Sequence, residues 1–242
     1  MDESPLRRGV AEFIGAFTLI FIGGGAGIVT GGHDLVAIGL ANGLAIGIMV
    51  SNLGHISGGH FNPAITLAFF ATRRITGLLA AVYWASQLAG AIVAAAILRW
   101  LFKNPAFLAA VPHAPGTTDF KALVLEGIMT FFLVWAVWAT AVDPGGAFKA
   151  IAGLAIGLTI TIDVYAGGPI TGAAMNPARA FGPELVGNFW GEGWIYYLGP
   201  VIGALIAALT YEYLYLRQVQ PPVVGTPESG VDEPRPGDAS TS

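Results

Sequence analysis

Long apolar runs separated by short polar segments dominate the chain. Six of these runs are close to the length of about 20 residues that an α-helix needs to cross a bilayer. Two further runs are much shorter, and each begins at an Asn-Pro-Ala sequence. The pattern predicts an all-α membrane protein with six transmembrane helices, at 9–30, 35–53, 77–100, 121–142, 148–166 and 193–216, and two re-entrant half-helices, at 62–72 and 176–187.

Corresponding residues recur at an interval of 110 to 114 positions; GLAIG at 43–47, for example, recurs at 153–157. Glu12 recurs as Glu126 and Asn62 recurs as Asn176, in both cases 114 positions later. We therefore expect a tandem duplication of three spanning helices and one half-helix. Because three is odd, the second repeat must cross the membrane in the opposite direction, as in transport proteins built from inverted repeats. The predicted repeats cover about 7–102 and 119–216, within a single channel domain of residues 1–216.

Composition supports a membrane protein and excludes several functions. The chain is 55% hydrophobic and 11% charged, whereas a soluble domain has about 25% charged residues. It has no cysteine and four scattered histidines, so we expect no disulfide, no metal, no cofactor and no enzymatic activity. The net charge of −4 gives no basic surface for nucleic acid. The segment 217–242 is rich in Pro, Gly, Ser and acids, which predicts a disordered tail.

Basic residues flank the predicted spans unevenly, which indicates the orientation. An even number of spans puts both termini on one side of the membrane, and an excess of Lys and Arg marks the cytoplasmic side. We therefore expect a multi-pass protein of the cell (inner) membrane with both termini and the tail in the cytoplasm. The basic residues on that side are Arg7, Arg8, Arg73, Arg74, Lys149, Arg217 and Arg235, against Lys103, Lys121 and Arg99 on the other.

The two Asn-Pro-Ala sequences predict a polar site at membrane depth. Irregular backbone survives there only where protein buries it or where it lines a wet cavity. Pro63 and Pro177 suit the first position of a helix, where a missing N–H costs nothing. Asn62 and Asn176 can cap these helices through the side-chain oxygen, which leaves the amide NH2 as a donor. Two helix N-termini that meet in this way favour neutral, oxygen-bearing solutes and repel cations.

The sequences SGGHFNPAITLA, TGAAMNPARAFGP and WIYYLGPVIGA closely resemble signatures of the aquaporin (major intrinsic protein) family. The resemblance spans roughly residues 7–216 and suggests a prokaryotic-type member. It implies the aquaporin fold, one pore in each protomer and a homotetramer in the lipid bilayer. The two pore motifs are then Asn62, Pro63 and Ala64, and Asn176, Pro177 and Ala178.

A cation in mid-span usually marks a pathway. By resemblance, Arg179 belongs to a selectivity filter together with Asn42, Val164 and Ala173. Water-selective members usually carry an aromatic residue and a histidine in this filter, and glycerol facilitators carry two aromatic residues. This chain has neither pattern, which favours passage of water with small neutral solutes such as glycerol, urea, ammonia or peroxide. A strictly water-selective channel is the first alternative, and a coupled secondary transporter or a structural junction component is a further one.

Two acids fall inside predicted spans, where an ionisable residue suggests function. The resemblance implies that Glu12 and Glu126 anchor the glycine-rich loops by accepting backbone N–H groups, and a proton relay is the alternative. Asp163 and Glu212 are interpreted as charges at helix ends or at the membrane interface. The remaining residues expected to line the pore are His60, Gly58, Gly59, Gly172 and Ala174.

Overall fold

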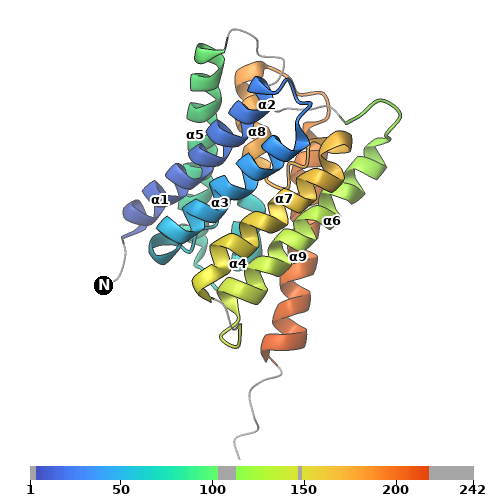
Figure 1. The fold of residues 1–242 in the computed structure, drawn as a ribbon. Helices are drawn as coiled ribbons and strands as arrows, with labels where there is room; N and C mark the ends of the chain where they lie inside the picture. Colours follow the sequence, from blue (N-terminus) through green and yellow to red (C-terminus); the bar gives the residue numbers. More distant parts are fainter. Residues whose placement is uncertain (1–3, 103–112, 147–148, 218–242) are drawn as a thin grey trace, which may run out of the picture.

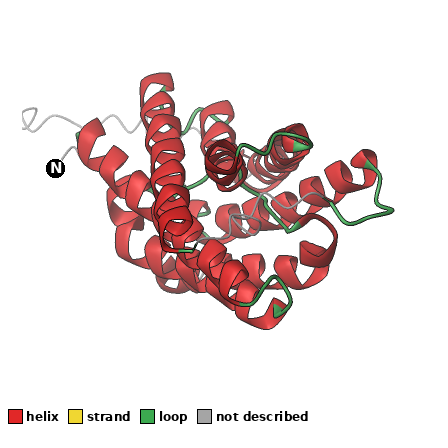
Figure 2. Ribbon diagram, turned by 90° about the horizontal axis from the view of Figure 1, so that it is seen from above, coloured by secondary structure: helices red, strands yellow, loops and turns green. Residues whose placement is uncertain are grey.

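The computed structural model describes residues 4–102, 113–146 and 149–217. Within this part the chain folds into helices and loops without a strand (Figure 2). Six helices are long and apolar enough to cross a membrane. They are α1 (Pro5–Thr18) with η1 (Leu19–Gly24) and α2 (Gly25–Val29), α3 (Leu35–Ser57), α5 (Gly77–Leu101), α6 (Asp119–Val137) with η3 (Trp138–Val142), α7 (Ala152–Thr171) after η4 (Lys149–Ile151), and α9 (Gly193–Tyr211) with η5 (Glu212–Leu216). The half-helices are α4 (Pro63–Ala71) and α8 (Pro177–Gly187).

The prediction of six spanning helices and two half-helices is confirmed, and one boundary differs clearly. Helix α7 does not end at residue 166 but continues through Pro169 to Thr171. Pro169 removes one N–H group from the helix, but in the absence of water the residues after it keep their own N–H groups bonded by continuing the helix. Asp163 therefore lies well inside α7 and is buried, so its interpretation as a helix-end charge is wrong. The predicted tail lies outside the described residues, except for Arg217.

The packing of the helices follows the internal duplication. Helix α1 packs against α5 as α6 packs against α9, and α3 of the first repeat packs against α7 of the second. Figure 1 shows α3, α7 and α6 running side by side. A Cβ atom on Gly47 would lie 2.8 Å from the carbonyl oxygen of Gly153, and one on Gly199 would lie 2.9 Å from that of Leu123. Glycine at these positions lets the backbones of paired helices touch.

The loops before the two half-helices repeat the same backbone conformation. Helices α4 and α8 lie towards opposite ends of the bundle, α4 near the lower end and α8 near the upper end in Figure 1. A positive φ is uncommon for a residue with a Cβ atom, and it persists only where the surroundings hold it. The φ angles are 92°, 68° and 49° at Gly58, Gly59 and Phe61, and 79°, 48° and 50° at Gly172, Ala173 and Met175.

Candidate functional site

The half-helices are joined by two reciprocal hydrogen bonds. The Nδ2 atom of Asn62 donates to the carbonyl oxygen of Met175 at 2.8 Å, and that of Asn176 donates to the carbonyl oxygen of Phe61 at 2.9 Å. Each side-chain oxygen accepts from the backbone N–H two residues further on, at 2.9 Å, and so caps its own helix. An amide NH2 has two protons, so each asparagine keeps one proton that these bonds do not use.

The prolines and alanines of the two motifs complete the helix starts. Pro63 and Pro177 are the first residues of α4 and α8. Ala64 and Ala178 have no exposed surface, so there is no space for a larger side chain without repacking. The geometry of the two motifs is therefore set by local capping and by contact between them.

Two fully buried carboxylates hold the loops that carry the motifs. The side chain of Glu12 accepts four hydrogen bonds and that of Glu126 accepts three, and each set includes two consecutive backbone N–H groups of the loop. These bonds stabilise the residues with positive φ. The donors to Glu12 are Ser57 Oγ at 2.6 Å, His60 N at 3.0 Å, Phe61 N at 2.6 Å and Gln87 Nε2 at 2.7 Å. The donors to Glu126 are Thr171 Oγ1 at 2.7 Å, Ala174 N at 2.9 Å and Met175 N at 2.7 Å.

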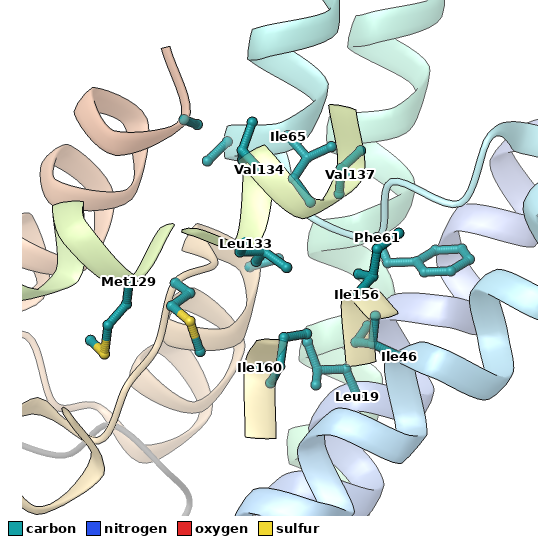
Figure 3. Packing of buried hydrophobic residues seen from close by; sticks show 14 of the residues in the cluster. Leu19, Ile46, Phe61, Ile65, Met129, Leu133, Val134, Val137, Ile156 and Ile160 are labelled. Carbon is teal, nitrogen blue, oxygen red and sulfur yellow. The ribbon is translucent and has the colours of Figure 1, made fainter. Parts of the chain in front are cut away.

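A narrow cavity, here called the inner cavity, lies where the half-helices meet. Its volume is about 20 Å³, and one water needs roughly 10–15 Å³ measured in this way. Its polar side chains are those of Asn42, His60, Asn62, Asn176 and Arg179. Much of the rest is apolar, and in Figure 3 the side chains of several of these residues lie close to one another. The apolar lining includes Leu19, Ile46, Leu133, Ile156 and Ile160.

The four expected filter residues line either this cavity or a wider one, the outer cavity, of about 290 Å³. Asn42 and Ala173 line the inner cavity, Val164 lines the outer cavity, and Arg179 lines both. The Nη2 atom of Arg179 donates to the carbonyl oxygen of Gly172 at 3.0 Å. Arg179, near the start of α8, therefore belongs to the linings of both cavities, with Asn42 of α3 beside it.

The amide of Asn42 is already engaged. Its oxygen accepts from Nε of Arg179 at 3.4 Å, and its nitrogen donates to the carbonyl oxygen of Ile38 at 2.8 Å. A Cβ atom on Gly23 would lie 2.6 Å from the amide carbon, so the side chain also fills the space beside this glycine. Asn42 therefore offers fewer polar atoms to a solute than its residue type suggests.

The other expected lining residues are distributed between the two cavities. Gly59 and Ala174 line the inner cavity, and Gly172 lines the outer cavity. Gly58 is not among the residues that line either cavity. It lies beside the imidazole of His60, since a Cβ atom on Gly58 would be 3.4 Å from Nε2 of the ring.

Several polar residues around the site were not anticipated from the sequence. Gln87 and Tyr83 lie on α5 and Thr66 lies on α4, and all three are completely buried. The hydroxyl group of Tyr83 donates to the carbonyl oxygen of Ser57, at the start of the first loop. Gln87 could have been found from the sequence, because its amide lies in the middle of the apolar span 77–100. A buried polar group in such a span needs a hydrogen-bond partner.

Comparison with known proteins agrees with this geometry. Residues 2–211 match the Major intrinsic protein (MIP) family. Aquaporin TIP4-4 of Zea mays is 40% identical over 226 residues, which cover 90% of both chains. Probable aquaporin TIP3-2 of Arabidopsis thaliana is 42% identical over 232 residues, covering 90% of this chain and 86% of the relative.

A solved structure shows the same fold. The aquaglyceroporin from Plasmodium falciparum superposes with a TM-score of 0.79 at 25% sequence identity, over 89% of this chain and 98% of the other. Family, relatives and fold agree with the six apolar helices and the paired Asn-Pro-Ala motifs. The chain therefore belongs to the major intrinsic protein family, the aquaporins, which are multi-pass membrane channels and not enzymes.

Proposed function

We propose that this chain is a passive channel that conducts water together with small neutral solutes and excludes ions and protons. The observation that carries the proposal is the reciprocal pairing of Asn62 and Asn176, which leaves each with one amide proton at the inner cavity. A passing oxygen atom accepts from these donors. A cation meets two positive helix ends and the guanidinium of Arg179 instead.

The same two donors explain the exclusion of protons. A water molecule whose oxygen accepts from both asparagines must donate its own protons outwards, to the neighbours on either side. Apolar side chains such as Ile46, Ile156 and Ile160 offer no alternative partner in the inner cavity. A continuous chain of donors pointing one way, which proton hopping requires, is therefore interrupted at this point.

The filter supports a range of solutes wider than water. Val164 and Ala173 are smaller than an aromatic or imidazole side chain and are apolar, so they suit a carbon backbone better than a narrow polar filter does. A second candidate, a strictly water-selective channel, is favoured by the small volume of the inner cavity and by the engagement of the Asn42 amide with Arg179. Glycerol and urea distinguish the two, because both are larger than water and neutral.

The test is re-swelling of shrunken proteoliposomes in glycerol and in urea, measured by light scattering. We expect both solutes to enter faster than into empty liposomes. Replacing Asn42→Phe together with Val164→His narrows the filter and is expected to reduce solute flux more than water flux. Val36→Phe, on the exposed face of α3, is the matched control. Water flow without entry of either solute would contradict the wider range and select the water-specific channel.

We also infer a homotetramer in the cell membrane, with both termini in the cytoplasm. The start of α1 and the end of η5 lie at the same end of the bundle (Figure 1). Near that end Arg74 forms a two-bond ion pair with Glu212, at 2.9 and 3.1 Å. Exposed Leu44 and Leu158 support contact with lipid or with further copies. Protease accessibility in oriented vesicles and native mass spectrometry test the orientation and the oligomer.

A further inference from the structure

A continuous chain of buried hydrogen bonds connects Glu12 to the inner cavity. The Nε2 atom of Gln87 lies 2.7 Å from Oε2 of Glu12 and 2.9 Å from Oγ1 of Thr66. Oγ1 of Thr66 lies 3.1 Å from Nδ1 of His60. His60 is 4% exposed and lines the inner cavity, and the other three residues have no exposed surface.

The direction of each bond follows from counting donors and acceptors. Each oxygen of Glu12 accepts a backbone N–H, so the carboxylate acts as an acceptor. The amide of Gln87 must then turn its NH2 group towards Glu12, because the carboxylate would repel the carbonyl oxygen of Gln87. The NH2 group has two protons, one for Glu12 and one for Thr66. Thr66 therefore accepts from Gln87 and has its own hydroxyl proton left to donate.

That proton goes to His60. A helical threonine often donates to the carbonyl oxygen four residues earlier, as Thr72 and Thr130 do. The hydroxyl of Thr66 bonds to Gln87 and His60 instead. If Thr66 donates, Nδ1 of His60 accepts, and the imidazole proton must be on Nε2.

Packing holds the imidazole ring in this position. The ring lies on Phe69, with the centroids 4.1 Å apart, and meets the edge of Tyr83 at 5.0 Å. A half-turn of the ring would put Cδ2 in place of Nδ1 and lose the bond to Thr66, and a smaller rotation would also disturb the ring contacts. Both the orientation of His60 and its tautomer are therefore determined by neighbours that lie outside the cavity.

The second repeat shows that the loop does not require this chain of bonds. The residues 114 positions after His60, Thr66 and Gln87 are Ala174, Ala180 and Val201. None of the three can form the equivalent bonds, yet the second loop has the same run of positive φ angles. The polar chain in the first repeat therefore has a role beyond support of the loop.

We propose that Gln87 and Thr66 are positioning residues that hold His60 as a neutral imidazole with its proton on Nε2, where it donates to permeating molecules. The proposal rests on the proposed function in one respect, that the inner cavity is the permeation path. With this tautomer His60 acts as a donor, like Asn62 and Asn176, and offers no basic nitrogen to a chain of water. The arrangement thereby strengthens the exclusion of protons.

Nitrogen-15 solid-state NMR of the full chain in lipid bilayers tests the tautomer directly. His60-Phe61 is the only His-Phe pair in the sequence. Labelling histidine with 13C and 15N and phenylalanine with 15N therefore assigns the His60 imidazole without a mutation. At neutral pH we expect Nδ1 to resonate as an unprotonated nitrogen and Nε2 as a protonated one. A proton on Nδ1, or on both nitrogens, would overturn the proposal.

Two variants test the positioning role. Thr66→Val has a similar shape but no hydroxyl group, so we expect mixed tautomers of His60 and a several-fold increase in proton leak. Thr66→Ser restores the hydroxyl and is expected to keep the parent spectrum and leak. A single Nε2–H tautomer of His60 in a folded Thr66→Val variant would contradict the positioning role of Thr66. If that variant does not fold, the spectrum of the parent chain decides whether the proposed tautomer is present. If the tautomer is as expected but water flux equals that of empty liposomes, the inner cavity is not a permeation path. The positioning of His60 by its neighbours would then still stand.

Discussion

The side-chain oxygen of Asn42 accepts a hydrogen bond from Nε of Arg179 at 3.4 Å. The contact joins α3 to the start of α8 and links Asn42, a residue of the proposed filter, to the one cation among the described residues that lines both cavities. Because Arg179 is only 8% exposed, its charge is poorly screened by water. We therefore expect the charge at position 42 to influence how strongly the proposed filter repels cations.

Replacing Asn42→Asp keeps the acceptor and adds a negative charge beside Arg179. The two opposite charges attract by about 4 kcal/mol at an effective dielectric constant of 20, and much of the positive barrier is cancelled. We expect the leak of protons or K⁺ into vesicles to rise by about tenfold or more, since a change of 1.4 kcal/mol is sufficient. Asn42→Leu, which adds no charge, is the control. An unchanged leak in Asn42→Asp would contradict this electrostatic role.

Replacing Arg179→Val removes the cation itself. We expect the variant to pass protons or small cations that the parent channel blocks. Water permeability should be retained, because the Asn62–Asn176 pair remains. A pH-sensitive dye trapped in vesicles measures the leak. If the dye shows no increase, exclusion rests on Asn62, Asn176 and the helix dipoles alone.

The buried acids are expected to differ in their effect on stability. In the parent chain the donors around Glu126 bond to its carboxylate, and Glu126→Gln would place an NH2 group against some of them. We expect the free energy of unfolding to fall by roughly 2–4 kcal/mol, with a lower melting temperature in detergent. Asp163 has a buried oxygen without a hydrogen-bond partner. Asp163→Asn removes a charge that is costly to bury and is expected to leave the melting temperature unchanged or higher. The opposite order of the two variants would contradict the assigned roles.

His113 is expected to make the stability of the loop before α6, residues 113–118, depend on pH. Its Nε2 atom lies 2.9 Å from Asp119 and 3.5 Å from Glu192, and the hydrogen bond to Asp119 is the main cause that raises the pKa of His113 above its usual 6.5. A raised pKa stabilises the folded loop fully below pH 6.5, and the effect is lost as the pH rises through the higher value. The adjacent Ala114 N–H donates to Ile170 at 2.7 Å and reports on the loop.

Hydrogen exchange of the Ala114 amide measures this dependence. Beyond the intrinsic effect of pH on exchange, we expect its protection in the parent chain to fall as the pH rises from 6.5 through the raised pKa of His113. The His113→Gln variant should show a flat profile over the same range. Equal slopes in the parent and the variant would exclude His113 as the titrating group.

The sequence predicts the half-helices well because their signals are local. Pro63 and Pro177 at the first helical position, each after an asparagine cap, determine where α4 and α8 begin. The end of α7 was missed because Pro169 interrupts helices in water, whereas burial in a membrane favours a continued hydrogen-bond ladder.

Contacts between distant segments could not be predicted from the sequence. The bond between Asn42 and Arg179 depends on the space left by Gly23, on a third segment. The chain from Gln87 to His60 depends on how α5 faces α4. Residue types reveal that a polar group needs a partner, but only the packing of the helices determines which partner it has.

Osmotic water permeability tests the central claim most directly. Stopped-flow light scattering compares proteoliposomes that contain the folded protein with empty liposomes of the same lipid. We predict a permeability clearly above the lipid background with a low activation energy, because water crosses a preformed path between Asn62 and Asn176. Permeability equal to that of empty liposomes, with the high activation energy of lipid diffusion, would contradict a channel.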